Sequence, residues 1–203
     1  MTKLPAVILA GGRATRMGGG DKGLRVVAGR RLIDHVIARL APQCAPLAIN
    51  ANGDPARLAE FGLPVLPDSL PDHPGPLAGV LAGLDWAASL GAPAIITAAA
   101  DTPFFPPDLA VRLAAHAGPT GLCLAASADP SGKMHRQPTF GLWPVALRDD
   151  LRAALTGGLR KIVLWTDSHN AGTATFPSRP FDPFFNINTP DDIIAAETLM
   201  GQA

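Results

Sequence analysis

The strongest chemical signal in the sequence is a run of glycines and basic residues near its start. Positions 9 to 22 read LAGGRATRMGGGDK. Glycine lacks a Cβ, so the backbone of such a loop can approach an anion closely and converge its N–H groups on phosphate oxygens. Arg16 and Lys22 add positive charge that suits a phosphate, although solvation at the surface is the alternative for Arg16. The segment therefore predicts a phosphate-binding loop.

Two familiar phosphate loops do not fit this segment. A Walker A motif requires Gly-Lys-Ser/Thr, whereas Lys22 follows Asp21 and precedes Gly23. Gly18, Gly20 and Gly23 satisfy the spacing of the dinucleotide fingerprint. They start well after the preceding apolar run has ended, where that fingerprint does not belong. The loop is therefore expected to belong to another class of phosphate site.

Polar side chains that suit nucleotide and metal binding follow other apolar runs. Asp101 comes directly after the run 94–100, so it is predicted to lie at a strand end and to hold Mg²⁺ against triphosphate oxygens. Capping of a helix near Pro107 is the alternative for Asp101, but the intervening residues make it a poor cap. Asn50 and Asp68 also follow apolar runs. Contact with a nucleotide explains these two residues, and turn formation or helix capping explains them equally well.

Short apolar runs alternate with stretches of helical spacing through the first two thirds of the chain. Runs of strand length lie at 6–10, 47–49, 64–66, 94–99 and 122–126. Stretches with helical spacing lie at 33–40, 77–90 and 107–116. This alternation predicts an α/β fold with a mostly parallel sheet and helices on both faces. Because open α/β sheets bind ligands at the carboxyl ends of their strands, the candidate residues are expected to share one edge.

The pattern changes after about residue 130. Short strands are predicted at 140–143 and 184–187, around a helix at 146–155, and they are expected to add antiparallel edges to the sheet. A closing helix is predicted at 191–200, with Thr189 as its N-cap and Pro190 at its first position. Strand alternation sends the side chains of Asn186 and Asn188 to one side, beside the expected site. A turn before Pro190 explains Asn188 equally well.

The composition fits one globular domain. The chain has 203 residues, of which 47% are hydrophobic and 17% charged, so residues 1–203 are expected to fold as a single unit. Lys plus Arg and Asp plus Glu each total 17, which gives no reason to expect a nucleic acid partner. Cys44 and Cys123 are isolated and are expected to be buried thiols. The apolar runs are too short for a signal peptide or a membrane span, so a cytoplasmic protein without a membrane partner is expected.

Several short motifs, in order along the chain, resemble those of one family. The Leu-Ala-Gly-Gly run, Arg16-Met17-Gly18 and Asp21-Lys22 resemble the signature loop of nucleotidyltransferases, most closely that of the molybdenum cofactor guanylyltransferases. Further matching motifs are NAN at 50–52, PDS at 67–69, GPLAG at 75–79, ADTPF at 100–104 and FNINTP at 185–190. Their order over nearly the whole chain makes the set specific. The resemblance implies a three-layer, Rossmann-like nucleotidyltransferase fold.

The resemblance also implies roles for individual residues. In that family the Leu-Ala-Gly-Gly segment and the lysine after it hold the nucleotide, which implies that GTP contacts Leu9, Ala10, Gly11, Gly12 and Lys22. Asn50 and Asp68 match nucleotide contacts of the family, and Asp101 matches the ligand of Mg²⁺. Asn186 and Asn188 resemble asparagines that line the region of the pterin acceptor and the metal. Residues 1–105 are then the nucleotide-binding part and residues 106–203 the acceptor-binding part.

The implied reaction transfers GMP from Mg-GTP to the phosphate of molybdopterin or Mo-molybdopterin, giving the guanine dinucleotide cofactor and diphosphate. An attacking phosphate is already ionised at neutral pH, so positioning and charge neutralisation by Lys22, Arg16 and Asp101 replace a protein nucleophile. Molybdopterin-inserting proteins and apo-molybdoenzymes are expected as transient partners. Two alternatives stay open: a related nucleotidyltransferase that uses CTP or a sugar-1-phosphate acceptor, and a non-catalytic carrier of the molybdenum cofactor.

Overall fold

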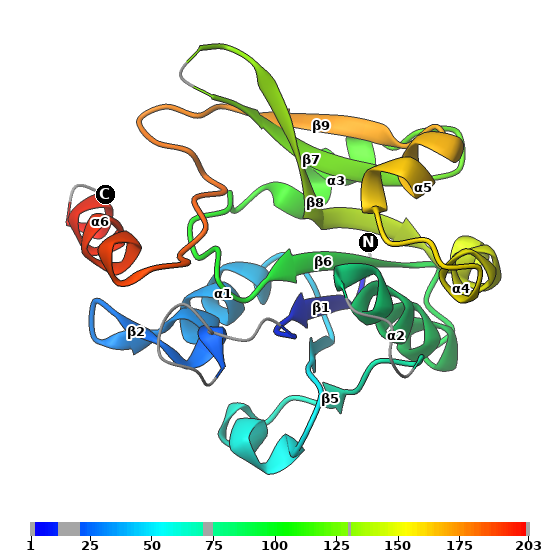
Figure 1. Ribbon diagram of the computed structural model, residues 1–203, viewed down its shortest axis with the longest axis horizontal. Coiled ribbons are helices and arrows are strands. Elements are labelled where there is room, and N and C mark those ends of the chain that lie inside the picture. Colours follow the sequence, from blue (N-terminus) through cyan, green and yellow to red (C-terminus); the bar gives the residue numbers. More distant parts are fainter. Residues whose placement is uncertain (1–2, 12–20, 71–74, 130, 202–203) are drawn as a thin grey trace.

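The protein is built around one mixed β-sheet (Figure 1). The structure is a computed structural model, and it describes residues 3–11, 21–70, 75–129 and 131–201. The sheet has seven strands in the order β5-β4-β1-β6-β8-β7-β9. The strands are β1 (Ala6–Leu9), β4 (Leu47–Asn50), β5 (Val65–Leu66), β6 (Ala94–Ala99), β7 (Cys123–Ala128), β8 (Met134–Pro144) and β9 (Gly172–Phe176). Neighbouring strands are parallel except that β8 runs antiparallel to both β6 and β7. The predicted mostly parallel sheet is confirmed.

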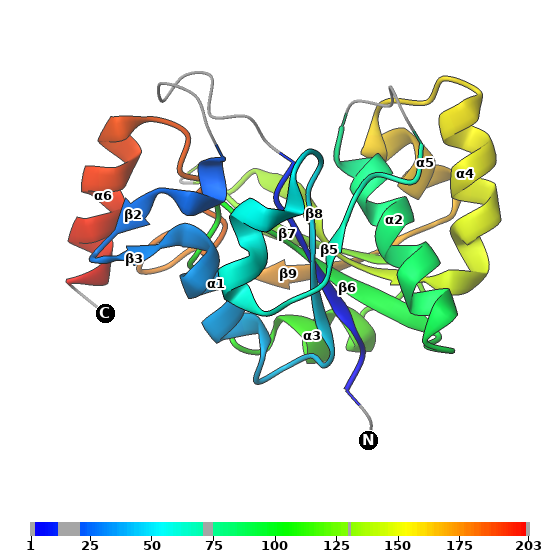
Figure 2. The same ribbon diagram turned by 90° about the horizontal axis from the view of Figure 1, so that it is seen from below.

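Helices cover both faces of the sheet and complete three layers (Figures 1 and 2). The α-helices are α1 (Leu32–Leu40), α2 (Pro76–Ser89), α3 (Leu109–Ala115), α4 (Arg148–Thr156), α5 (Ile162–Ser168) and α6 (Pro190–Met200). Alternate residues of β1 face opposite layers, because successive strand side chains point to opposite faces. Ile8 packs in a cluster with residues of α1 and α3, and Val7 packs in a second cluster with residues of α2, α4 and α5.

The antiparallel strand lies inside the sheet, whereas the sequence predicted antiparallel strands at its edges. After β6 and α3 the chain forms β7, which is not paired with β6. Strand β8 then fills the position between β6 and β7. Trp143 of β8 fixes this arrangement from within the core, since its indole N–H donates to the Thr97 hydroxyl of β6 at 2.8 Å. Both groups are buried, so the bond satisfies two polar atoms that would otherwise be costly to bury.

The segment 184–187 is not a strand, so that prediction was wrong. Its apolar side chains are buried: Phe184 packs in the cluster of α1 and α3, and Ile187 packs beneath α6. Prolines at 177, 180 and 183 precede the segment, and they lack the N–H that a sheet ladder needs. The edge position is taken by β9 instead, which the sequence reading missed together with α5.

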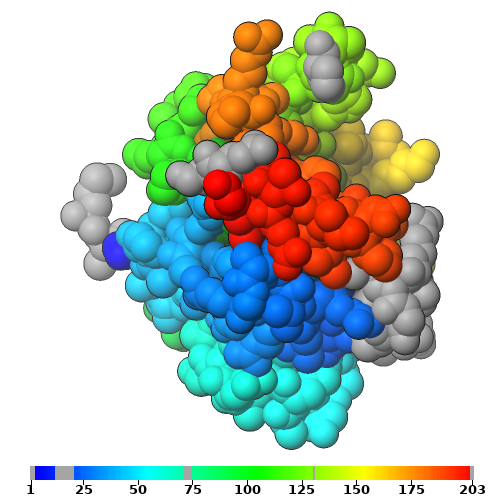
Figure 3. All heavy atoms as spheres, turned by 90° about the vertical axis from the view of Figure 1, so that its left-hand side faces the viewer, coloured from blue at the N-terminus to red at the C-terminus, as the bar shows by residue number. Residues whose placement is uncertain are grey.

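The end of the chain folds back onto an early hairpin. Short strands β2 (Val26–Val27) and β3 (Arg30–Arg31) form a separate two-stranded sheet. Helix α6 packs against it, and Figure 3 shows the two segments side by side on one face. The Ala28 N–H donates to the Glu197 carboxylate of α6 at 3.1 Å. No helix of the described ranges is long and apolar enough to cross a bilayer.

Both cysteines are buried, as predicted, with Cys44 1% and Cys123 0% exposed. Burial raises the pKa of the Cys44 thiol to about 12 and that of Cys123 to about 11. Because the thiolate is the reactive form, neither thiol is expected to react with Ellman's reagent in the native protein at pH 8. Both are expected to react once guanidinium unfolds the chain. Rapid release of the reagent's chromophore from native protein would contradict this packing.

Candidate active site

The ends of four parallel strands bring the candidate residues to one edge of the sheet. Leu9 of β1 is paired in register with Asn50 of β4 and with Ala99 of β6, and Asn50 is paired with Leu66 of β5. The chain therefore leaves these strands side by side, toward Ala10, Asp68 and Asp101. This confirms the predicted common edge. Leu9 is buried and Ala10 half-buried, whereas Gly11 is exposed, and a Cβ built on it would meet no atom of the described residues within 4 Å. Gly12 and Arg16 lie outside the described residues.

Lys22 lies at the centre of a polar cluster at this edge. It begins a short 3-10 helix, η2 (Lys22–Leu24), and its ammonium donates to Asp101 Oδ2 at 2.7 Å. The same ammonium donates to Asn188 Oδ1. The Lys22 and Asp101 side chains are 16% and 17% exposed, so the ion pair is largely shielded from water while both side chains keep some exposure. The fold thus joins three predicted site residues that lie far apart in sequence.

The two asparagines near the end of the chain have different surroundings in the structure, although the Asn188 amide donates to the Asn186 carbonyl at 3.4 Å. They were expected to share one side of a strand, but the segment is a loop, in which Asn188 reaches Lys22 and Asn186 is exposed. The loop is held to the sheet by the Ile187 N–H, which donates to the Asp101 carbonyl at 3.0 Å. This bond places Asn188 beside Asp101. The role of Asn186 stays a prediction.

A second polar cluster surrounds Asp68, beyond the ends of β4 and β5. Asn50, 4% exposed, donates to Asp68 Oδ1 at 2.9 Å and to the Leu66 carbonyl at 3.0 Å. Asn52 donates to Asp68 Oδ2 at 2.7 Å, and its own amide oxygen accepts from the Asp68 N–H at 2.9 Å. An ionised carboxylate has about four acceptor positions, so Asp68 keeps capacity for a ligand. The sequence reading placed Asn52 in a motif but gave it no role.

Gly79 makes room for the Asn50 side chain. It lies in the first turns of α2, and a Cβ built on it would come within 2.1 Å of Asn50 Oδ1. Real Cβ atoms do not approach an oxygen so closely, so even alanine would displace Asn50. The GPLAG motif was the sequence signal for this contact, although nothing in the motif alone indicates its partner.

Arg57 connects the two clusters, and the sequence reading missed it. It lies on a 3-10 helix, η3 (Pro55–Phe61), and its guanidinium pairs with the Asp21 carboxylate next to Lys22. It also donates to the Asn52 carbonyl at 2.6 Å. Arg57 thereby ties the start of η2 to the segment after β4. In sequence it is a lone arginine in the short segment PARLAEF, and such an arginine is usually solvated, so no local signal marks it.

A capping box fixes the start of α6 and with it the loop that carries Asn188. The Thr189 hydroxyl accepts from the Asp192 N–H, and the Asp192 carboxylate accepts from the Thr189 and Asn188 N–H groups at 2.8 Å. The predicted N-cap and first-turn proline are therefore confirmed. Partial burial raises the pKa of Asp192, but these hydrogen bonds and the charge of Lys22 outweigh it, so the pKa lies below 3.8.

Replacing Asp192 by alanine is expected to destabilise the protein in a pH-dependent way. Loss of a helix cap costs about 1 kcal/mol, which lowers Tm by roughly 2–4 °C in a chain of this size. Because folding lowers the pKa of Asp192, its stabilisation is present above 3.8 and is lost as the pH falls through the folded-state value. The Tm difference should therefore shrink below that pH. Asp191→Ala, at the exposed neighbouring position, is the control; equal Tm shifts for both variants would contradict the assignment.

The residues at this edge fit a divalent cation that is coordinated partly by the protein and partly by the phosphate oxygens of a bound molecule. Asp101 and Asn188 both direct an oxygen at the Lys22 ammonium, so two hard oxygen donors already face one cation. Groups of three or more His, Cys, Asp or Glu side chains that could hold a metal do not occur among the described residues. A small hard cation such as Mg²⁺ needs only one or two carboxylates when phosphate oxygens and water supply the other ligands. Asp101 suits that role.

Comparison with known proteins agrees with this geometry. The family profile described as the MobA-like NTP transferase domain matches residues 6–170. A Bradyrhizobium protein named molybdenum cofactor guanylyltransferase is 55% identical over 203 residues, covering 98% of this chain and 93% of that protein. A protein of the same name from Cereibacter sphaeroides is 50% identical over 199 residues, covering 98% of this chain and 97% of that protein.

Solved structures share the fold at low sequence identity. Molybdopterin-guanine dinucleotide biosynthesis protein A from Archaeoglobus fulgidus superposes with a TM-score of 0.72 at 23% identity, covering 98% of this chain and 100% of that chain. A nucleotidyl transferase from Methanothermobacter has a TM-score of 0.70 at 20% identity, covering 100% and 99% of the two chains. These likenesses establish the nucleotidyltransferase fold. With the profile match and the near full-length relatives, they show that the chain belongs to the molybdenum cofactor guanylyltransferase family, within the MobA-like NTP transferase domain family.

Proposed function

We propose that this protein transfers GMP from GTP to the phosphate of molybdopterin or Mo-molybdopterin, releasing diphosphate. The observation that carries the proposal is the pairing of Lys22 with Asp101 at the carboxyl edge of the parallel strands. A cation and a metal-binding carboxylate are the two groups that a triphosphate needs there. The relatives named molybdenum cofactor guanylyltransferase support the choice of reaction.

The roles proposed for Lys22 and Asp101 rest on their positions, and the role proposed for Arg16, which lies outside the described residues, rests on the sequence. Lys22 neutralises phosphate charge, and Arg16 of the same segment assists at the α-phosphate or the leaving diphosphate. Asp101 would hold Mg²⁺, which would supply positive charge against the triphosphate when bound. The attacking phosphate of the acceptor needs no protein base, because it is already ionised. The chain's contribution is therefore positioning and charge neutralisation.

The nucleotide is proposed to lie along the ends of β1, β4 and β5. The backbone at Leu9, Ala10, Gly11 and Gly12 contacts it, since Gly11 lies exposed two residues beyond the end of β1. Guanine presents N–H donors at N1 and N2, and a carboxylate is the acceptor that suits them. Asp68 offers free acceptor capacity and is held in place by Asn50 and Asn52. We assign guanine recognition to this cluster.

The acceptor is proposed to approach from the other side of Lys22, where the loop with Asn186 and Asn188 lies. Residues up to about 105 would then bind the nucleotide and residues from about 106 the pterin, within one domain. Molybdopterin-inserting proteins and apo-molybdoenzymes are the proposed transient partners of a cytoplasmic enzyme. Each of these assignments follows from the proposed reaction.

The test is incubation of the protein with molybdopterin, Mg²⁺ and each nucleoside triphosphate in turn, followed by identification of the dinucleotide by mass spectrometry. The guanine dinucleotide and stoichiometric diphosphate are expected with GTP. A cytosine dinucleotide as the main product would overturn the choice of nucleotide. Binding of GTP and molybdopterin without release of diphosphate would favour a carrier.

A further inference from the structure

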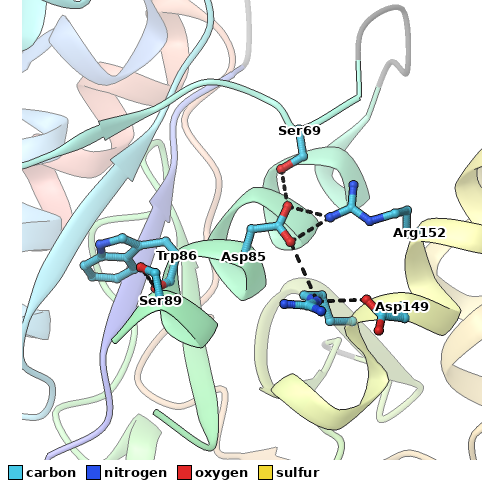
Figure 4. Close-up of polar contacts among 7 residues, drawn as sticks. Ser69, Asp85, Trp86, Ser89, Asp149 and Arg152 are labelled. Carbon is cyan, nitrogen blue, oxygen red and sulfur yellow. Dashed lines mark hydrogen bonds and ion pairs between the residues drawn. The ribbon is translucent and has the colours of Figure 1, made fainter. Parts of the chain in front are cut away.

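A cluster of charged side chains outside the proposed site joins helices α2 and α4 (Figure 4). At its centre is Asp85 of α2, whose two carboxylate oxygens accept from Arg152 of α4 at 2.6 and 2.7 Å. Arg148, at the start of α4, lies 3.8 Å from Asp85 and pairs also with Asp149 at 2.9 Å. Two arginines therefore fix the orientation of one partly buried carboxylate.

The same carboxylate holds a residue of the loop that follows β5. The Ser69 hydroxyl donates to Asp85 Oδ2 at 2.6 Å, and Figure 4 shows it pointing from the loop toward the helix. A hydroxyl bound to a charged acceptor makes a stronger bond than one bound to a neutral acceptor. The loop is thus anchored to α2 at Ser69.

Ser69 is the chain neighbour of Asp68, so its bond to Asp85 lies directly beside the second polar cluster. Asn50 and Asn52 hold the Asp68 side chain from the strand side. The Ser69 bond to Asp85 holds the adjacent residue from the helix side. With both anchors in place, the backbone at 68–69 has little freedom to turn the carboxylate away.

We propose that Asp85 is a positioning residue for nucleotide binding, which fixes Asp68 through the Ser69 hydroxyl and is itself oriented by Arg152. The inference rests on the proposed function, in which Asp68 accepts from the base of GTP. A loop that is ordered before binding loses less conformational entropy when the ligand arrives. Because the base is remote from the reacting phosphorus, the contact is equally present in the bound and transition states. It therefore acts on KM rather than on kcat.

The decisive variant is Ser69→Ala, which removes the anchor and leaves the pair between Asp85 and Arg152 intact. Its KM and Kd for GTP are expected to rise about tenfold, the equivalent of ~1.4 kcal/mol, with kcat within about twofold of wild type. Ser69→Thr keeps the hydroxyl and is expected to restore the wild-type KM.

Ser89→Ala is the matched control. Ser89 lies on α2, as Asp85 does. Its hydroxyl donates to the Trp86 carbonyl at 2.7 Å, a bond of similar length to that of Ser69 but within α2 (Figure 4). It is expected to leave KM unchanged.

Asp85→Ala is expected to raise KM as Ser69→Ala does. The double variant is expected to raise KM no further, because both substitutions remove the same anchor. Asp85→Ala is also expected to lower Tm, since Arg152 loses its partner.

The outcomes separate the two proposals. Wild-type protein that does not bind GTP contradicts the proposed function and this inference with it. Wild-type protein that binds GTP, together with a Ser69→Ala variant that matches Ser89→Ala in KM, contradicts the inference alone. A fall in kcat with unchanged KM for Ser69→Ala also contradicts it, because it would place the anchor's effect on the chemical step.

Discussion

Replacing Asp101 by alanine is expected to lower kcat for guanylyl transfer about 10³-fold, equivalent to ~4 kcal/mol of lost transition-state stabilisation. The carboxylate is the proposed protein ligand of Mg²⁺, and the backbone at this position would be unchanged. The Asp101 carbonyl still accepts the Ile187 N–H, and Lys22 retains Asn188 Oδ1. The variant should therefore fold, with Tm close to that of wild type, and the loss should lie in the chemistry.

Steady-state assays over a range of Mg²⁺ concentrations, with Tm measured in parallel, check this expectation. Asp108→Ala is the matched control, because Asp108 is an exposed aspartate that pairs with Arg112 of α3 at 3.7 Å. It should retain wild-type turnover. An Asp101→Ala variant with unchanged turnover in saturating Mg²⁺ would remove Asp101 from the reaction and with it the proposed metal site.

Replacing Lys22 by methionine is expected to lower kcat/KM for GTP by about 10²-fold, or ~2.7 kcal/mol. Methionine preserves most of the alkyl stem, so the change removes one positive charge and little packing. Two consequences follow: triphosphate charge loses a neutralising partner, and Asp101 loses its ion pair at 2.7 Å. Because both side chains retain some exposure to solvent, the cost to stability should be smaller than that of breaking a fully buried pair.

Lys3→Met supplies the control for this substitution. Lys3 precedes β1 at the amino end of the strand, and its ammonium donates to the Ala41 carbonyl at 3.3 Å, away from the proposed site. Measurement of GTP affinity by titration calorimetry, beside steady-state kinetics, separates binding from turnover. If Lys22→Met bound and used GTP as well as Lys3→Met does, Lys22 would not contact the triphosphate.

The sequence alone was sufficient for those features that depend on neighbouring residues. Apolar runs of strand length followed by glycine or a polar residue located the ends of β1, β4 and β6, and so placed Leu9, Asn50 and Asp101 at one edge. The cap at Thr189 was equally readable, because it depends on residues within one turn of the helix. Burial of the two cysteines followed from their isolation in the chain.

The tertiary structure decided which distant residues meet. Lys22, Asp101 and Asn188 come from three parts of the chain, and their contact depends on a loop that the local pattern had misread as a strand. The contacts of Arg57 and Asp85 could not be predicted from the sequence for the same reason. Each residue pairs with residues that no periodicity of the sequence connects to it. Local spacing determines how a segment folds and which edge it reaches. Pairing between segments depends on how the layers pack, and that information is spread over the whole core.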